Sequence, residues 1–228
     1  MAETLLSAEA VSRVFTTGAG DVHALTDVSM TVTKGELVVV RGPSGSGKTT
    51  LLNLLGGLDR PTSGRVLLGD GRELSALPEK EVLAVRRSRI GYVFQSFGLI
   101  PVLSAAENVE IPLRLLETDP AERQARVTAA LELVGLAGHA RQRPYELSGG
   151  QQQRVGIARA LVAEPDILIA DEPTGQLDSA TAATIMDLIS ELTHARGLAA
   201  VVSTHDPVLM ARADRVVELH DGALLTPA

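Results

Sequence analysis

Short, uninterrupted apolar runs alternate along the chain with longer segments in which apolar residues recur every three or four positions. The runs are brief, rich in β-branched residues and bounded by polar turns, so they predict buried strands at residues 37–40, 166–173 and 198–206. The recurring pattern predicts helices at residues 48–55, 151–165 and 179–197, which end at Gly56, Pro165 and Gly197. Strands that alternate with helices in this order predict a mostly parallel sheet covered on both faces.

Two regions depart from this alternation. Residues 5–15 and 24–33 show partial apolar alternation on either side of a turn-rich stretch, which predicts antiparallel β structure. Residues 104–116 and 120–136 are helical by periodicity, with prolines at their boundaries, and predict an inserted helical subdomain. We therefore expect a single domain over residues 1–228, with a helical subdomain at about 96–154 and a core formed by about 1–95 and 155–228.

Composition narrows the classes of function. Of the 228 residues, 45% are hydrophobic but only 2% are aromatic, so the core has to be built mainly from Leu, Val, Ile and Ala. The net charge of −7 and the scarcity of aromatic platforms argue against a nucleic-acid partner. The short Arg-rich stretch 86–89 is better explained as a solvated face. The absence of cysteine excludes disulfides, zinc–thiolate sites and a cysteine nucleophile.

The sequence also lacks signals for the membrane and for a histidine metal site. No apolar run approaches the ~20 residues of a membrane helix, and the first 15 residues lack the basic and apolar regions of a secretory signal. The histidines at 23, 139, 194 and 220 are scattered without ligand spacing. We expect a cytoplasmic protein that acts at a membrane only through a partner.

The strand at 37–40 runs into a glycine-rich loop that opens a helix. The stretch GPSGSGKTT fits the phosphate-loop pattern G-x-x-x-x-G-K-[ST]. Its small residues let backbone N–H groups surround a β-phosphate, while Lys48 reaches the β and γ oxygens and the Thr49 hydroxyl ligates Mg²⁺. An ordinary Gly/Ser turn is the competing explanation, and the placement between a strand and a helix disfavours it. Nucleotide binding is therefore predicted for Gly42, Pro43, Ser44, Gly45, Ser46, Gly47, Lys48, Thr49 and Thr50.

The apolar run ILIA ends in two acidic residues. If this strand ends beside the phosphate loop, Asp171 lies near the metal and Glu172 can polarise a water for in-line attack on the γ-phosphate. A strand that simply ends in two solvated acids is the alternative. The phosphate loop earlier in the chain favours the catalytic interpretation.

Four motifs in this order resemble the nucleotide-binding subunits of ABC (ATP-binding cassette) transporters: GPSGSGKTT, LSGGQQQRV, ILIADEPTGQLD and VSTHD. The resemblance covers essentially the whole chain, and LSGGQ is its most specific element. Within that family, YVFQSFGLIPVLSAAENVEIPL resembles the macrolide-export and lipoprotein-release group. The resemblance implies an α/β fold with a P-loop NTPase core (three layers, mostly parallel sheet), an N-terminal antiparallel β subdomain and an inserted helical subdomain. It also implies an ATPase, converting ATP and water to ADP and phosphate, that energises a transporter or a mechanotransmission permease.

The resemblance assigns roles to single residues. Gln95 is the residue expected to contact Mg²⁺ and the attacking water and to sense the permease, and His205 is expected to contact the γ-phosphate. Asp178 is expected to cross to a partner subunit, and Phe15 to stack on adenine. Each has an ordinary alternative: a surface glutamine, a histidine at a strand end, a core phenylalanine. Gln176 stands where the family more often has a small residue or Asn, and we expect it to affect dimer contacts modestly.

The same family pattern gives the LSGGQ segment a role as a second phosphate-binding loop, in addition to the loop at residues 42–50. In an antiparallel dimer, Ser148, Gly149, Gly150 and Gln151 of one copy close over the γ-phosphate held by Lys48 of the other. ATP binding then closes the dimer and hydrolysis opens it. The expected partners are a second copy and integral-membrane permease subunits, met at the cytoplasmic face of the membrane. The permease is expected to dock near residues 95–105, although ordinary subdomain packing explains those apolar groups equally well.

Two further functions remain open from the sequence. A translation, DNA-repair or chromosome ATPase of the same superfamily would carry a second cassette, a coiled coil or a zinc insertion, and none is visible. A nucleotide-dependent scaffold that tethers a permease to an envelope machine would bind ATP for assembly, with hydrolysis secondary. The effect of the permease on the ATPase rate separates this scaffold from an energy-coupling enzyme.

Overall fold

Two sheets form the frame of the protein in its computed structural model, which describes residues 3–18 and 20–225. Residues 1, 2, 19 and 226–228 of the expected 1–228 domain lie outside the described part. The larger sheet has the strand order β5-β6-β7-β3-β8-β9. Its strands are β3 (Leu37–Arg41), β5 (Ile90–Val93), β6 (Ile167–Asp171), β7 (Ala199–Ser203), β8 (Arg215–His220) and β9 (Ala223–Leu224). All neighbours pair in parallel except β8 and β9, as the alternation of strands and helices predicted.

The smaller sheet is antiparallel and comes mostly from the N-terminal part of the chain. Its order is β2-β1-β4, and its strands are β1 (Thr4–Thr17), β2 (Gly20–Thr33) and β4 (Ser63–Leu68). The register of β1 against β2 is interrupted by several bulges, and these irregularities fit the partial alternation seen in the sequence. The expected N-terminal antiparallel region is therefore confirmed.

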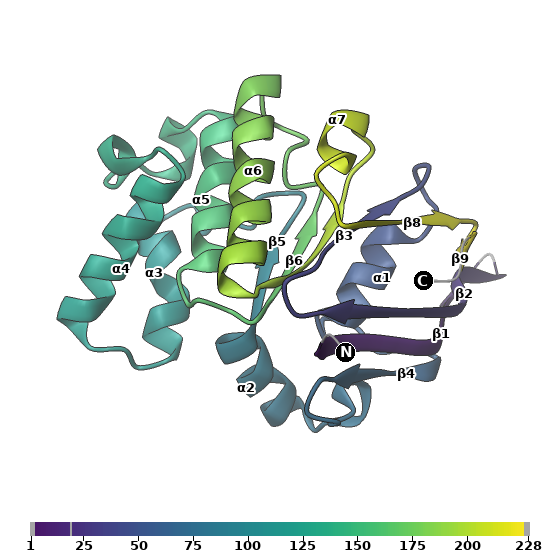
Figure 1. Cartoon of the computed structure of the whole chain (residues 1–228). Coiled ribbons are helices and arrows are strands. Elements are labelled where there is room, and N and C mark those ends of the chain that lie inside the picture. The colour runs from purple at the N-terminus through teal and green to yellow at the C-terminus, as the bar shows by residue number, and fades with distance from the viewer. Residues whose placement is uncertain (1–2, 19, 226–228) are drawn as a thin grey trace.

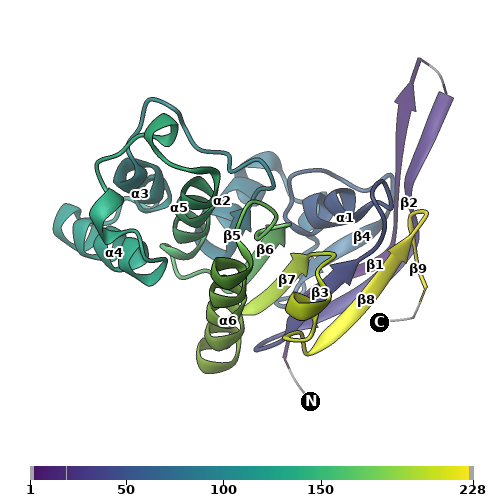
Figure 2. The same cartoon turned by 90° about the horizontal axis from the view of Figure 1, so that it is seen from above.

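Two hydrophobic clusters lie on opposite faces of the parallel strands. Successive residues of β3 divide between them, because side chains along a strand point alternately to the two faces. Val38 and Val40 join the cluster around α1 (Lys48–Leu55), which is packed between the two sheets. Leu37 and Val39 join the cluster beneath α5 (Gly149–Leu161) and α6 (Ser179–Arg196). Figure 2 shows α1 and α6 on opposite sides of β6, β7 and β3.

A helical subdomain projects from one end of this core (Figure 1). It contains α3 (Ala105–Leu115), α4 (Pro120–Leu133) and the start of α5. Ser104 and Glu107 form a capping box at the start of α3, and the Asp119 carboxylate caps α4. Helix α5 continues without a break through residues 154 and 155, the expected boundary between subdomain and core.

The remaining elements are short or were not expected. Helix α2 (Glu79–Arg89) carries the Arg-rich stretch on its last turn and precedes β5, and the sequence pattern predicted neither element. Helix α7 (Pro207–Met210) is a single turn after β7. The described residues also contain three 3₁₀ turns: Leu74–Ala76, Ala137–His139 and Pro144–Glu146.

Candidate nucleotide-binding site

The loop between β3 and α1 is held tightly against the rest of the core. A Cβ atom at Gly42 would lie 2.1 Å from the Leu219 carbonyl oxygen, so no larger residue fits there. Gly47 has a φ of +101°, and a Cβ on it would lie 2.4 Å from the Ala24 carbonyl oxygen. Gly47 is also the N-cap of α1, and no side chain caps this helix. The first N–H groups of α1 therefore remain available for an anion.

Two polar side chains in this loop are buried. Lys48 is only 9% exposed, and its Nζ donates to the Gly42 oxygen at 2.8 Å and to the Pro43 oxygen at 2.9 Å. The Ser46 hydroxyl is buried and has no hydrogen-bond partner in the described part of the chain. Buried polar groups normally have partners, so an unpartnered hydroxyl in this loop is suited to a polar ligand such as an anion.

A hydrogen-bond network joins this loop to two neighbouring strands. The Thr49 hydroxyl donates to Asp171 Oδ2 at 2.7 Å, and the Ser203 hydroxyl donates to Asp171 Oδ1 at 2.7 Å. Asp171 and Ser203 are register partners at the carboxyl ends of β6 and β7. The Glu172 backbone N–H in turn donates to Ser203 Oγ at 2.8 Å. One buried serine thus fixes both acidic residues predicted from the sequence.

The same oxygens fit a magnesium ion. Mg²⁺ binds oxygen ligands at 2.0–2.1 Å in octahedral geometry, which separates adjacent ligands by about 3 Å. Thr49 Oγ1 and Asp171 Oδ2 lie 2.7 Å apart. No group of three His, Cys, Asp or Glu side chains among the described residues could hold a metal by itself. A magnesium site here would therefore share its ligands with phosphate and water, as Mg²⁺ usually does in nucleotide enzymes.

Glu172 and His205 lie together at the carboxyl edge of the sheet. Glu172 has a φ of +45°, an uncommon backbone conformation for a residue other than glycine. Its Oε1 lies 3.9 Å from Nδ1 of His205, whose side chain is 77% exposed. The pair is close enough to share a water molecule or a phosphate oxygen, and its exposure leaves room for one.

Phe15 lies near the end of β1 and is 38% exposed. The Arg13 guanidinium lies 4.3 Å from its ring centroid, a cation–π distance. Arg13 is held in turn by Asp59, to which Nε and Nη2 donate at 2.8 and 3.0 Å. The phenyl ring is thus supported on one side and partly exposed, which is consistent with stacking on a base.

The LSGGQ segment forms a second helix start, with Ser148 as the N-cap of α5. Gly149 and Gly150 lie in the first turn of that helix. The Gln151 side chain turns back and accepts from the Ser148 backbone N–H at 2.8 Å. No hydrogen bond links residues 148–151 to residues 42–50 in the described part of the chain. Within one copy of the chain, the hydrogen bonds of each loop are therefore made separately.

The other predicted residues lie around these loops. Gln95 is exposed in the segment after β5. Asp178 is the N-cap of α6, where hydrogen bonds from the Thr181 hydroxyl and N–H lower the pKa of its carboxyl. Gln176 is exposed, and its Oε1 lies 3.9 Å from the position of a Cβ on Gly149 of the same chain.

Two supporting residues were missed from the sequence. Ser203 had a detectable signal, because it ends a buried strand as Asp171 does, and adjacent parallel strands place such ends side by side. Arg13 also had a detectable signal, because it precedes Phe15 by two positions and residues two apart on a strand share a face. Neither signal alone specifies the partner that each residue contacts.

Comparisons with known proteins show which family this chain is similar to. A family model described as "ABC transporter" matches residues 25–175. The Bacillus subtilis "ABC transporter ATP-binding protein YtrE" is 48% identical over 204 residues, which cover 90% of this chain and 88% of that protein. The Rhodopseudomonas palustris (strain HaA2) "Macrolide export ATP-binding/permease protein MacB" is 44% identical over 225 residues, or 99% of this chain and 34% of that protein. The solved dimeric structure of a post-hydrolysis state of the ATP-binding cassette MJ0796, bound to ADP and Pi, is similar with a TM-score of 0.94 and 41% identity, covering 97% of both chains.

These similarities confirm the expected α/β P-loop fold and the expected likeness to macrolide-export proteins. The chain spans about a third of the length of the curated relatives described as ATP-binding/permease proteins. Among the described residues, no helix has both the length and the apolar character needed to cross a bilayer.

Proposed function

The chain belongs to the ABC transporter family, and from that premise we propose that it binds and hydrolyses ATP to drive a membrane transporter or a mechanotransmission permease. The observation that carries the proposal is the network at the carboxyl edge of the sheet. There Thr49, Asp171, Ser203 and Glu172 are linked by three hydrogen bonds of 2.7–2.8 Å beside the buried Lys48. A purely structural role does not require a buried lysine and two acidic groups at one helix start.

Residues of the phosphate loop bind and orient the triphosphate. Lys48 exchanges its two backbone carbonyl acceptors for β- and γ-phosphate oxygens, and the uncapped N–H groups of α1 surround the β-phosphate. Thr49, Asp171 and Gln95 are the residues we assign to Mg²⁺, which when bound would neutralise charge on the phosphate oxygens. Phe15, supported by Arg13, stacks on the adenine.

Glu172 and His205 carry the hydrolytic step. The Glu172 carboxylate accepts a proton from the water that attacks the γ-phosphate, and His205 donates to an oxygen of that phosphate. The Ser203 bond to the Glu172 backbone N–H sets the position of this carboxylate relative to Asp171. Gln95 orients the same water.

A second copy of the chain completes each site. Ser148, Gly149 and Gly150 of one copy contact the γ-phosphate bound by the other, and Gln151 and Asp178 support that contact. The similarity to a dimeric cassette bound to ADP and Pi supports this arrangement. ATP therefore stabilises the closed dimer, and loss of the γ-phosphate removes the shared ligand.

The permease is the remaining partner that we propose. The exposed Ile100 and Val102 follow Gln95 at the border between the core and the helical subdomain, which we place at residues 96–154. We propose that a cytoplasmic part of an integral-membrane permease docks there, so that the chain works at the cytoplasmic face of the membrane. Relatives described as export ATP-binding/permease proteins support this partner.

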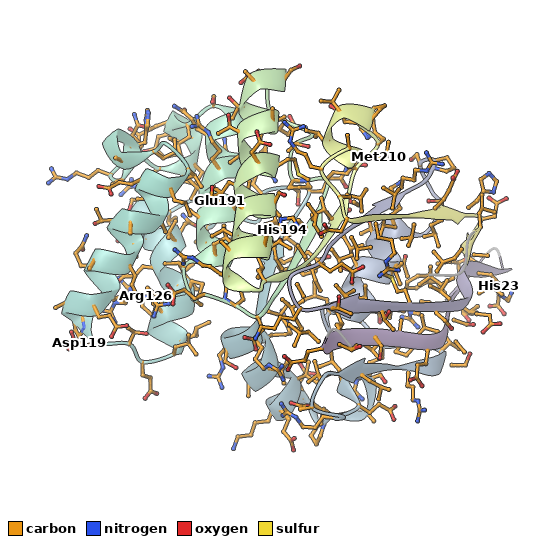
Figure 3. All side chains as sticks on the ribbon, in the orientation of Figure 1. His23, Asp119, Arg126, Glu191, His194 and Met210 are labelled. Atoms are coloured by element: carbon orange, nitrogen blue, oxygen red, sulfur yellow. The ribbon has the colours of Figure 1, made fainter. Side chains whose placement is uncertain are left out.

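The decisive experiment uses Glu172→Gln, which removes the proton acceptor but preserves shape. With ATP and Mg²⁺, this variant should elute as a dimer on size exclusion while its ATPase rate falls at least about 100-fold. Glu191→Gln, an exposed change on α6, is the matched control and should leave the parent behaviour unchanged (Figure 3). A Glu172→Gln variant that hydrolyses ATP at the parental rate would show that the base is misassigned.

A further inference from the structure

The start of α5 depends on a capping box between two residues of the LSGGQ segment. Ser148 Oγ accepts from the Gln151 N–H at 3.2 Å, and Gln151 Oε1 accepts from the Ser148 N–H at 2.8 Å. Because the Ser148 oxygen acts as the acceptor in this box, its hydroxyl hydrogen remains free to donate to a ligand. The capping box thus presents Ser148 as a donor at the exposed end of α5.

A histidine outside the motif fixes the Gln151 amide. Since Gln151 Oε1 faces the Ser148 N–H, its amide nitrogen faces the other way, and it lies 3.3 Å from His139 Nε2. An amide NH₂ only donates, so His139 Nε2 has to be the acceptor. His139 then carries its proton on Nδ1, which lies 2.5 Å from the acceptor oxygen Gln142 Oε1. Both contacts are therefore satisfied together by the tautomer that carries its proton on Nδ1.

The loop that carries His139 is itself tied to another helix start. The Gln142 N–H donates to the His139 oxygen at 3.0 Å, and the Gln142 oxygen accepts from the Ala105 N–H at 2.7 Å. The Ala140 oxygen accepts from the Ala106 N–H at 2.9 Å. The loop thus satisfies the otherwise unpaired N–H groups at the start of α3 and, through His139, orients the start of α5.

We propose that His139 is a positioning residue for the LSGGQ loop: through Gln151 it holds Ser148 and the first turn of α5 in the arrangement that closes over the γ-phosphate of a second copy. This inference rests on the proposed function and extends it, because it turns Gln151 from a nucleotide contact into a link between His139 and Ser148. A chain that lacks this link still binds ATP in its own phosphate loop but closes poorly on a partner's ATP.

The test is His139→Phe, which keeps a ring of similar size but lacks both nitrogens, placed in the Glu172→Gln background. The ATP concentration for half-maximal dimer formation on size exclusion with light scattering should rise about tenfold, the effect of one lost hydrogen bond between polar groups. ATP affinity of the monomer, measured by titration at protein concentrations too low for dimers, should stay within about twofold of the parent, since Lys48 and α1 are untouched. His194→Phe on α6 is the matched control and should change neither value.

A second variant separates positioning from simple loss of stability. Gln151→Met breaks the same link from its other end and also removes the acceptor for the Ser148 N–H, so it should raise the ATP requirement at least as much as His139→Phe does. Adding His139→Phe to it should cause no further rise. Additive effects of the two changes, an unchanged ATP requirement in His139→Phe, or an equal loss of monomer affinity would each overturn the inference. If the Glu172→Gln parent itself forms no dimer with ATP, the proposed function fails first, and the two failures are thus distinguishable.

Discussion

The two glycine-containing helix starts are built in opposite ways. The start of α1 has a left-handed glycine, no side-chain cap and a buried lysine, and both Gly42 and Gly47 touch neighbouring backbone. The start of α5 has a side-chain capping box, two glycines inside the helix and an exposed Ser148. The first combines uncapped helix N–H groups with a lysine side chain, so a single chain supplies the donors that we propose for the phosphates. The second has already satisfied part of its own N–H groups, so it offers fewer donors and suits a ligand that another surface already holds.

The largest effect should come from removing the charge at the first helix start. Lys48→Ala deletes the only buried ammonium among the described residues, so ATP hydrolysis should fall at least about 100-fold and ATP binding should weaken strongly. Calorimetric titration with ATP and a phosphate-release assay measure the two effects. Lys80→Ala, an exposed change on α2, is the control. Near-parental binding by Lys48→Ala would contradict the assignment of the first loop as the receptor.

Replacing a glycine by alanine should destabilise the protein more at the start of α1 than at the start of α5. Gly47→Ala meets the Ala24 oxygen at 2.4 Å with φ at +101°, so the free energy of unfolding should fall by about 2–4 kcal/mol. Gly150→Ala meets nothing closer than 3.3 Å and has helical backbone, so stability should change by less than about 1 kcal/mol. Urea unfolding followed by circular dichroism measures both. Equal losses in the two variants would mean that the second loop is as constrained as the first.

Ser148→Ala tests the cap that only the second start possesses. Loss of the N-cap oxygen should lower the free energy of unfolding by about 1 kcal/mol, because the Gln151 N–H loses its acceptor. Monomeric ATP binding should be unaffected, since α1 has no such cap. Urea denaturation gives the first value and ATP titration at low protein concentration gives the second. A Ser148→Ala protein with weaker monomeric binding would argue that one chain does use both loops on one ligand.

The smallest effect should come from an exposed ion pair that belongs to neither loop. His194 Nε2 on α6 lies 3.0 Å from Asp214 Oδ1, and this hydrogen bond raises the pKa of His194 (Figure 3). A raised pKa in the folded state means that stabilisation is full below the unfolded value near 6.5 and is lost as the pH rises through the folded pKa. Both side chains are more than 40% exposed, so the change should stay below about 0.5 kcal/mol. Chemical denaturation at pH 6 and pH 9 measures the change in the free energy of unfolding, and His194→Asn is the control. A protein that is instead more stable at pH 9, with a difference that disappears in His194→Asn, would contradict the prediction.

The sequence predicted those parts of the molecule whose pattern lies within one continuous stretch of residues. The phosphate loop, the 48–55 helix and the strand before Asp171 each carry a local pattern with one physical meaning, and the structure confirms the two elements at those positions. Helix α2 was missed because most of its residues are charged or polar. Strand β5 was missed because it has only four residues. A Cβ on Gly91 would lie 2.3 Å from the Ala160 oxygen, so its close packing depends on tertiary contact that no local pattern encodes.

The sequence predicted the residues of the candidate site better than it predicted the residues that hold them in position. The Asp171 and Glu172 pair was visible as two acids after an apolar run, whereas the Ser203 bond that joins them spans neighbouring strands. His139 and Gln151 are twelve positions apart, and which residues come into contact there depends on how the loop before α5 packs against the start of α3. The assigned roles of the site residues stay predictions until the variants above are measured.

The unbroken course of α5 through the border between subdomain and core makes it a lever. Its 13 residues span about 20 Å, with a buried end at Leu161 and an exposed end at Ser148. A tilt of only about 10° at the buried end would swing the exposed tip by about 3 Å, roughly the length of one hydrogen bond. A push on the helical subdomain that tilts α5 about its buried end would therefore displace Ser148 enough to make or break the contact that we propose with the second copy.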